Sequence, residues 1–125
     1  MKQHRISEAE WEVMEVIWRR SPISAAEIHA QLSDTAGWAM NTVRTMLARL
    51  VKKAVLKFGQ EGNAYLYRPA VPRERCVHGE VRSLLQRVFG GAPHSLLTHF
   101  VEHEPLTPAQ IQELQQILKR KEADL

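Results

Sequence analysis

Three segments of the sequence carry the residue pattern of a capped helix start, and they constrain where the chain can form helices. Each has a Ser or Thr followed three positions later by Glu or Gln, at residues 7–10, 24–27 and 107–110. In this capping box the hydroxyl accepts a hydrogen bond from a backbone N–H of the first turn, and the Glu or Gln side chain accepts one from the N–H of the capping residue. Apolar residues flank each box at the spacing of a hydrophobic staple. The pattern therefore predicts at least three well-defined helices.

The first half of the chain predicts three helices followed by two strands. Apolar residues recur at helical spacing over residues 8–20, 25–33 and 40–53. Two short β-prone runs, 55–58 and 64–68, then enclose a loop of turn residues at 59–63. Pro69 and Pro72 follow and are expected to break the chain, which places a domain boundary between residues 71 and 72.

Three helices followed by a hairpin is the element order of a winged helix-turn-helix unit. In helix-turn-helix proteins the recognition helix enters the major groove of DNA, and here that is the third helix. We therefore predict a mainly α fold with a small β-hairpin. Residues 1–71 would form a winged helix-turn-helix DNA-binding domain, and residues 72–125 a helical dimerisation domain.

Positive charge is concentrated in the segment of the predicted third helix and hairpin. Residues 41–70 contain six Lys or Arg and one Glu, whereas the whole chain has a net charge of +3. A basic stripe confined to one segment is typical of a nucleic-acid interface, although a solvated charged surface is the alternative. Arg, Asn and Thr can read base edges, whereas Lys binds phosphates. The predicted DNA-contacting residues are Asn41, Thr42, Arg44, Thr45 and Arg49, with Lys52, Lys53 and Lys57 on the phosphates.

The second half of the chain predicts helices over residues 73–89, 93–103 and 108–122, with a Gly90-Gly91 helix end. These helices are rich in apolar residues, yet a unit of about 54 residues rarely forms an adequate core alone. We therefore expect a second copy to complete the core in a two-fold homodimer. The expected interface residues are Val77, Val81, Leu84, Leu85, Val88, Leu97, Phe100, Val101, Ile111, Leu114, Ile117 and Leu118.

Three stretches resemble the BlaI/MecI penicillinase-repressor family, and together the resemblance covers nearly the whole chain. They are ISEAEWEVM at 6–14, WAMNTVRTMLARLVKK at 38–53 and YLYRP at 65–69. The resemblance implies a dimeric bacterial transcriptional repressor whose N-terminal part binds operator dyads in double-stranded DNA. The Ser-Pro that usually opens the recognition helix in this family is Ala39-Met40 here.

The resemblance also implies how the repressor is released from DNA. Family members respond to β-lactams through a membrane-bound sensor-protease, which cuts the repressor at an Asn-Phe bond in its dimerisation part. The matching bond here is His99–Phe100, with His in place of Asn. A copper-responsive branch of the family uses paired cysteines, which this chain lacks because Cys76 is its single cysteine.

Two other functions remain open from the sequence. His99 and His103 lie one helical turn apart and could share a metal ion, with His94 as a further ligand, in a metal-responsive winged-helix regulator. The fold could also serve as a protein-interaction module that does not bind DNA, although the basic third helix favours DNA. The H-x-x-E-H pattern at 99–103 occurs in some zinc peptidases, but a chain of 125 residues leaves little room for a substrate cleft. We therefore expect no enzymatic activity and no cofactor, and we expect Cys76 to be a small buried apolar residue.

The sequence favours a cytoplasmic protein that is not inserted into a membrane. No apolar run approaches the roughly 18 residues of a membrane-spanning helix, and no apolar signal segment follows the start of the chain. A single cysteine is consistent with a reducing compartment.

Overall fold

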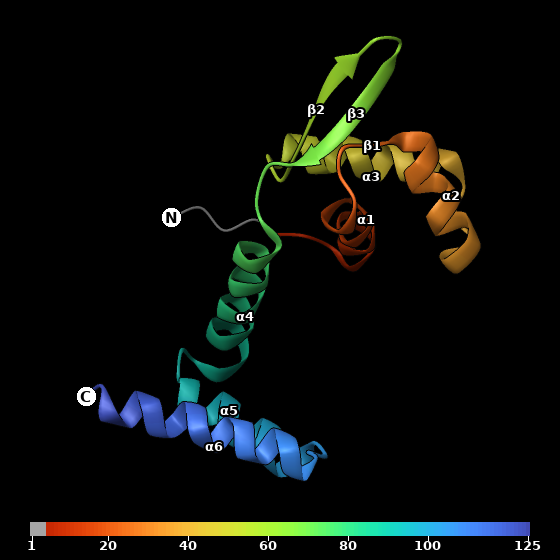
Figure 1. The fold of residues 1–125 in the computed structure, drawn as a ribbon. Coiled ribbons are helices and arrows are strands. Elements are labelled where there is room, and N and C mark those ends of the chain that lie inside the picture. Colours follow the sequence, from red (N-terminus) through yellow and green to blue (C-terminus); the bar gives the residue numbers. More distant parts are fainter. Residues whose placement is uncertain (1–4) are drawn as a thin grey trace. The chain divides into compact units, whose positions relative to one another are not determined.

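The computed structural model describes residues 5–125 (Figure 1). The chain divides into two compact units, one ending at Arg82 and the other comprising Ser83–Leu125. The predicted boundary after residue 71 falls in the loop before helix α4 (Arg73–Phe89), whereas the two units divide inside that helix. Each unit is described by itself.

The N-terminal unit is a winged helix-turn-helix fold, as the element order predicts. Its elements are α1 (Glu8–Arg19), β1 (Ile23–Ser24), α2 (Ala25–Ala36), α3 (Met40–Lys52), β2 (Leu56–Glu61) and β3 (Ala64–Pro69). The three strands form one antiparallel sheet in the order β1-β3-β2. The β2–β3 hairpin, which we call the wing, projects beyond the three helices (Figure 1).

The capping boxes form at all three predicted positions. At α1, the Glu10 backbone N donates to Ser7 Oγ over 3.2 Å, and the Ser7 N donates to Glu10 Oε1 over 2.8 Å. Ser24 and Glu27 make the same reciprocal pair at α2. Helix α3 begins after Ala39 with no side-chain cap, because alanine offers no side-chain acceptor.

The end of α2 corrects one predicted boundary. The sequence predicts a helix over residues 25–33, but α2 continues through Ala36. It ends where Gly37 adopts a left-handed conformation, with φ of 68°, and closes the last turn through its backbone N–H. The helix therefore ends at the glycine, which adopts the left-handed cap conformation without steric cost, and continues through the polar residues that precede it.

The wing is longer and its turn is tighter than predicted. Residues 59–63 were expected to form a loop, but Gly59 pairs with Leu66 and β2 continues to Glu61. The turn comprises residues 62 and 63, with φ of 63° at Gly62. Pro69, expected to break the chain, is instead the last residue of β3, at a strand end where a missing N–H is tolerated.

One buried apolar core joins the helices to the sheet. Fully buried side chains come from α1, α2 and α3, from strands β1 and β2, and from the residue before β2: Val13, Met14, Ile17, Ile23, Ile28, Val43, Leu47, Leu50, Val55 and Leu56. Trp11, Trp18 and Trp38 pack against this core while remaining partly exposed. Strand β1 was not predicted, because two residues are too short for a periodic pattern to appear.

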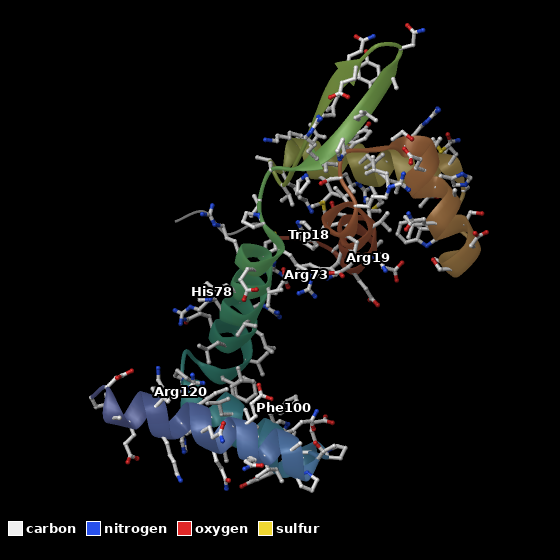
Figure 2. The ribbon with its side chains drawn as sticks, viewed as in Figure 1. Trp18, Arg19, Arg73, His78, Phe100 and Arg120 are labelled. Atoms are coloured by element: carbon white, nitrogen blue, oxygen red, sulfur yellow. The ribbon has the colours of Figure 1, made fainter. Side chains whose placement is uncertain are left out.

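The first turns of α4 belong to the N-terminal unit. Cys76 is buried in the shared core, as expected from the sequence. The indole N–H of Trp18 donates to the Val71 carbonyl over 3.0 Å, and Arg73 Nε donates to Glu15 Oε1 over 2.7 Å (Figure 2). These contacts hold the start of α4 against α1.

The C-terminal unit contains the end of α4, α5 (Pro93–His103) and α6 (Pro108–Ala123). Thr107 and Gln110 form the predicted capping box of α6, and Gly90 and Gly91 both adopt positive φ after α4. Within this unit only Ser83 and Leu85 are buried. Across residues 5–125, none of the helices combines the length and the apolar character needed to cross a bilayer.

Candidate nucleic-acid interface

Helix α3 separates its side chains into a core face and a free face. Val43, Met46, Leu47 and Leu50 are buried at the spacing of one helical stripe. The opposite side carries the predicted recognition residues, and every one of them is exposed: Asn41, Thr42, Arg44, Thr45, Arg49 and Lys52. The same periodicity that builds the core therefore presents one continuous polar and basic surface.

Arg44 lies where the recognition helix meets the wing. A groove runs between the N-terminal ends of α2 and α3 and the wing, and its lining includes Met40, Arg44, Asn63 and Tyr65. A nucleic-acid backbone or base edge in this groove would meet residues of both α3 and the hairpin.

The wing contributes one cation that no acid of the wing neutralises. Arg68 forms an ion pair with Glu61, with 2.8 Å between the guanidinium and carboxylate atoms, whereas Lys57 is exposed on β2 opposite Arg68. Phe58 packs edge-on against Tyr65, with 5.7 Å between ring centroids, and stiffens the hairpin.

Lys53 has a partner that the sequence did not reveal. Its Nζ lies 2.6 Å from Glu10 Oε1, and the Glu10 side chain is only 1% exposed. Burial raises the pKa of the Glu10 carboxyl, but hydrogen bonds from Lys53 and Ser7 outweigh it and hold the pKa below its ordinary value. Lys53 thus differs from its neighbour Lys52, which is exposed.

Most of the predicted interface residues of the C-terminal region are exposed in the single chain. Val81, Leu84, Val88, Leu97, Phe100, Val101, Ile111, Leu114, Ile117 and Leu118 are all at least about one-third exposed. Leu85 is an exception, because it is 4% exposed and faces the interior of its own unit. Val77 is partly buried in the N-terminal unit. Figure 2 shows Phe100 on α5 and Arg120 on α6.

The histidines of α5 come together as a pair. The rings of His99 and His103 stack with 4.2 Å between centroids, and His103 Nδ1 lies 2.8 Å from the His99 carbonyl. His94 approaches Thr98 instead. Within residues 5–125 no group of three or more His, Cys, Asp or Glu side chains is arranged to hold a metal ion. The His99–Phe100 bond lies inside the regular helix α5.

The N-terminal unit defines the chain as a winged helix-turn-helix protein with a basic recognition helix. The family model described as penicillinase repressor matches residues 6–120. The penicillinase repressor of Bacillus licheniformis is 38% identical over 115 residues, which cover 92% of this chain and 90% of that protein. The methicillin resistance regulatory protein MecI of Staphylococcus aureus strain N315 is 32% identical over 120 residues, which cover 96% of this chain and 98% of that protein. The chain belongs to the penicillinase repressor family, as its resemblance to BlaI and MecI predicts.

Solved structures agree with this assignment in the N-terminal unit. The solution structure of the DNA-binding domain of the repressor BlaI matches this chain with 42% sequence identity and a TM-score of 0.54. The match covers 59% of this chain and 90% of the BlaI chain. The monomeric form of Bacillus licheniformis BlaI, in complex with the blaP half-operator, has the same identity and coverage with a TM-score of 0.53.

Proposed function

We propose that this chain is a sequence-specific transcriptional repressor that binds an inverted-repeat operator as a homodimer. The observation that carries the proposal is the exposed polar face of α3, on a unit that is 42% identical to a DNA-binding domain. A protein-interaction module would have no need for a helix face built from Arg, Asn and Thr beside a basic wing.

The chemistry of α3 suggests how it reads DNA. Asn41, Arg44 and Arg49 can form paired hydrogen bonds with adenine and guanine edges in the major groove. Thr42 offers a hydroxyl or a methyl group to bases. The Thr45 hydroxyl donates to the Asn41 carbonyl over 2.9 Å, so Thr45 offers its methyl group or its oxygen as an acceptor. Lys52 and the wing residue Lys57 would bind phosphates and fix the register of the protein on the duplex.

Homodimerisation is supported by the composition of the C-terminal unit. Its helices expose many large apolar side chains, and its own interior contains little more than Leu85. Such a unit gains most of its buried apolar area only when a second chain covers it. A two-fold dimer would place its recognition helices about 34 Å apart, or a multiple of that distance, to meet two half-sites.

Release from DNA would require a signal that separates the dimer or lowers its affinity. Proteolysis by a membrane-bound sensor-protease at His99–Phe100 is the route that family membership suggests. Because that bond lies inside α5, its cleavage would require α5 to open locally.

The test of DNA binding is selection of duplexes from a random pool by the purified chain at near-physiological salt. We expect an inverted repeat whose affinity falls steeply with salt. Arg49→Ala should weaken binding to the selected duplex by about 1–3 kcal/mol. Arg19→Ala removes the same charge from α1 and serves as the matched control. No enriched sequence, or equal affinities for the two variants, would contradict the proposal.

The dimer is tested separately by sedimentation equilibrium. Leu114→Asp places a charge on the exposed apolar face of α6 and should shift the chain to monomer, with loss of high-affinity binding to the full inverted repeat. Gln115→Asp adds the same charge at the next position and should remain dimeric. A Leu114→Asp chain that sediments as a dimer would refute this interface.

A further inference from the structure

A single buried carboxylate oxygen connects the beginning of α1 to the end of α3. Glu10 Oε1 accepts from the Ser7 backbone N at 2.8 Å and from Lys53 Nζ at 2.6 Å. Ser7 is the N-cap of α1 and Lys53 is the C-cap of α3. The atom that completes the capping box of α1 therefore also binds the C-cap residue of α3.

The backbone of α3 ends in a defined motif at this same point. The Ala54 N–H donates to the Val51 carbonyl over 3.0 Å, and the Val55 N–H donates to the Leu50 carbonyl over 3.1 Å. Ala54 has φ of 63°, so the pattern is a Schellman motif with alanine in the position that glycine usually occupies. The chain reverses direction here and enters the wing, so the orientation of Lys53 is tied to both α3 and the hairpin.

The Glu10–Lys53 pair leaves part of a buried carboxylate without a hydrogen-bond partner. The second oxygen of Glu10, Oε2, is buried and has no hydrogen-bond partner among the described residues. The pair is buried on one side only, because the Glu10 side chain is 1% exposed and the Lys53 side chain 37%. Burying a carboxylate has a desolvation cost, and an unsatisfied oxygen adds to that cost. The best-attested role of such pairs is to fix one arrangement among several apolar packings.

We propose that Glu10 and Lys53 are positioning residues that fix the end of the recognition helix for DNA binding, and that Lys53 does not itself contact phosphate. This inference rests on the proposed function and revises the role predicted for Lys53. Val43, Leu47 and Leu50 pack α3 onto the core through apolar contacts, which have little directional preference. The Glu10–Lys53 ion pair adds a directional contact at the end of α3 that carries Arg49 and Lys52.

The two roles for Lys53 predict different salt dependences. A lysine that neutralises a phosphate contributes about 0.9 to the slope of log K against log salt, so its loss flattens the slope. A positioning lysine lowers affinity but leaves the slope unchanged, because the number of neutralised phosphates is the same.

The experiment measures affinity and salt slope for variants on the inverted-repeat duplex that the wild-type chain selects. Glu10→Gln keeps the shape and the cap, since Gln110 occupies the equivalent position in the capping box of α6. We expect Glu10→Gln, Lys53→Met and the double variant each to bind about three- to tenfold more weakly, with equal losses and the wild-type slope. The double variant keeps the test valid if Lys53→Met alone unfolds around an unpaired Glu10.

Two matched controls separate position from charge. Glu12→Gln removes the same charge from an exposed site on α1 and should bind DNA as the wild type does. Lys52→Met removes a neighbouring exposed lysine and should flatten the salt slope. Circular dichroism at the assay temperature checks that every variant is folded.

The outcomes that overturn the inference are distinct from failure of the proposed function. If Glu10→Gln binds within twofold of wild type, the ion pair does not position the helix. If Lys53→Met flattens the slope as Lys52→Met does, Lys53 is a phosphate contact. If Glu10→Gln and Lys53→Met losses multiply in the double variant, the residues act independently. If the wild-type chain selects no duplex, the proposed function fails, and the positioning role fails with it.

Discussion

Replacing Ala54 with glycine should stabilise the N-terminal unit, although it removes a side chain. Ala54 has φ of 63°, a left-handed conformation that costs a non-glycine residue about 1–2 kcal/mol. Glycine avoids that cost but gains entropy in the unfolded chain, worth about 0.4–1 kcal/mol. The difference predicts a gain of about 0.5–1 kcal/mol in the free energy of unfolding.

The assay is urea denaturation followed by tryptophan fluorescence. Trp11, Trp18 and Trp38 are the three tryptophans of the chain and all lie in the N-terminal unit, so the signal reports on that unit. With an m-value of about 2 kcal/mol/M, the Ala54→Gly midpoint should rise by about 0.3–0.5 M. Protein concentration must be equal in all samples, because dimerisation would make the midpoint depend on it.

Ala48→Gly provides a control of opposite sign. Ala48 is exposed in the middle of α3, where glycine costs about 1 kcal/mol relative to alanine. The same substitution at two alanines six positions apart should therefore shift the midpoint in opposite directions. An Ala54→Gly midpoint at or below that of the wild type, with the expected fall for Ala48→Gly, would refute the strain argument.

Three further predictions concern buried groups. Leu50→Ala removes a fully buried side chain from α3 and should cost about 2–5 kcal/mol of unfolding free energy in the same urea assay, and a loss below 1 kcal/mol would count against the core assignment. The fold lowers the pKa of Glu10, so the contribution of this carboxylate to the free energy of unfolding is complete above the unfolded pKa of about 4.3. That contribution is lost as the pH falls through the lower folded pKa. Glu10→Gln should therefore lose less unfolding free energy than wild type when the pH is lowered over this range. Burial, together with the Glu80 carboxylate, raises the pKa of the Cys76 thiol, so a disulfide reagent should label it much more slowly in the native chain than in urea; equal rates would contradict its burial.

Features set by neighbouring residues are the ones that the sequence predicts well. The capping boxes at Ser7, Ser24 and Thr107 form because the cap and its partner are three residues apart. The core face of α3 follows from the spacing of its apolar residues, and the exposure of Arg44 and Arg49 follows with it.

Features that depend on distant partners are not visible in the sequence pattern. Gly59 suggests a turn locally, but pairing with Leu66 keeps it in the strand. The sequence pattern around Lys53 does not show that it is paired, because its partner Glu10 is 43 positions away. Leu85 has the same apolar spacing as its exposed neighbours, and only the fold of its unit shows that it faces inward.

The exposed apolar side chains of the C-terminal unit have a consequence for how sharply such a repressor responds. If chains associate through those side chains and only the pair binds the operator tightly, then at low protein levels the active species grows as the square of the chain concentration. Halving the amount of protein would then lower the active pool about fourfold. The C-terminal unit buries little more than Leu85 by itself, so its apolar side chains would favour association of two chains. That association would make the regulated gene respond to the amount of repressor more steeply than it would respond to a monomeric repressor.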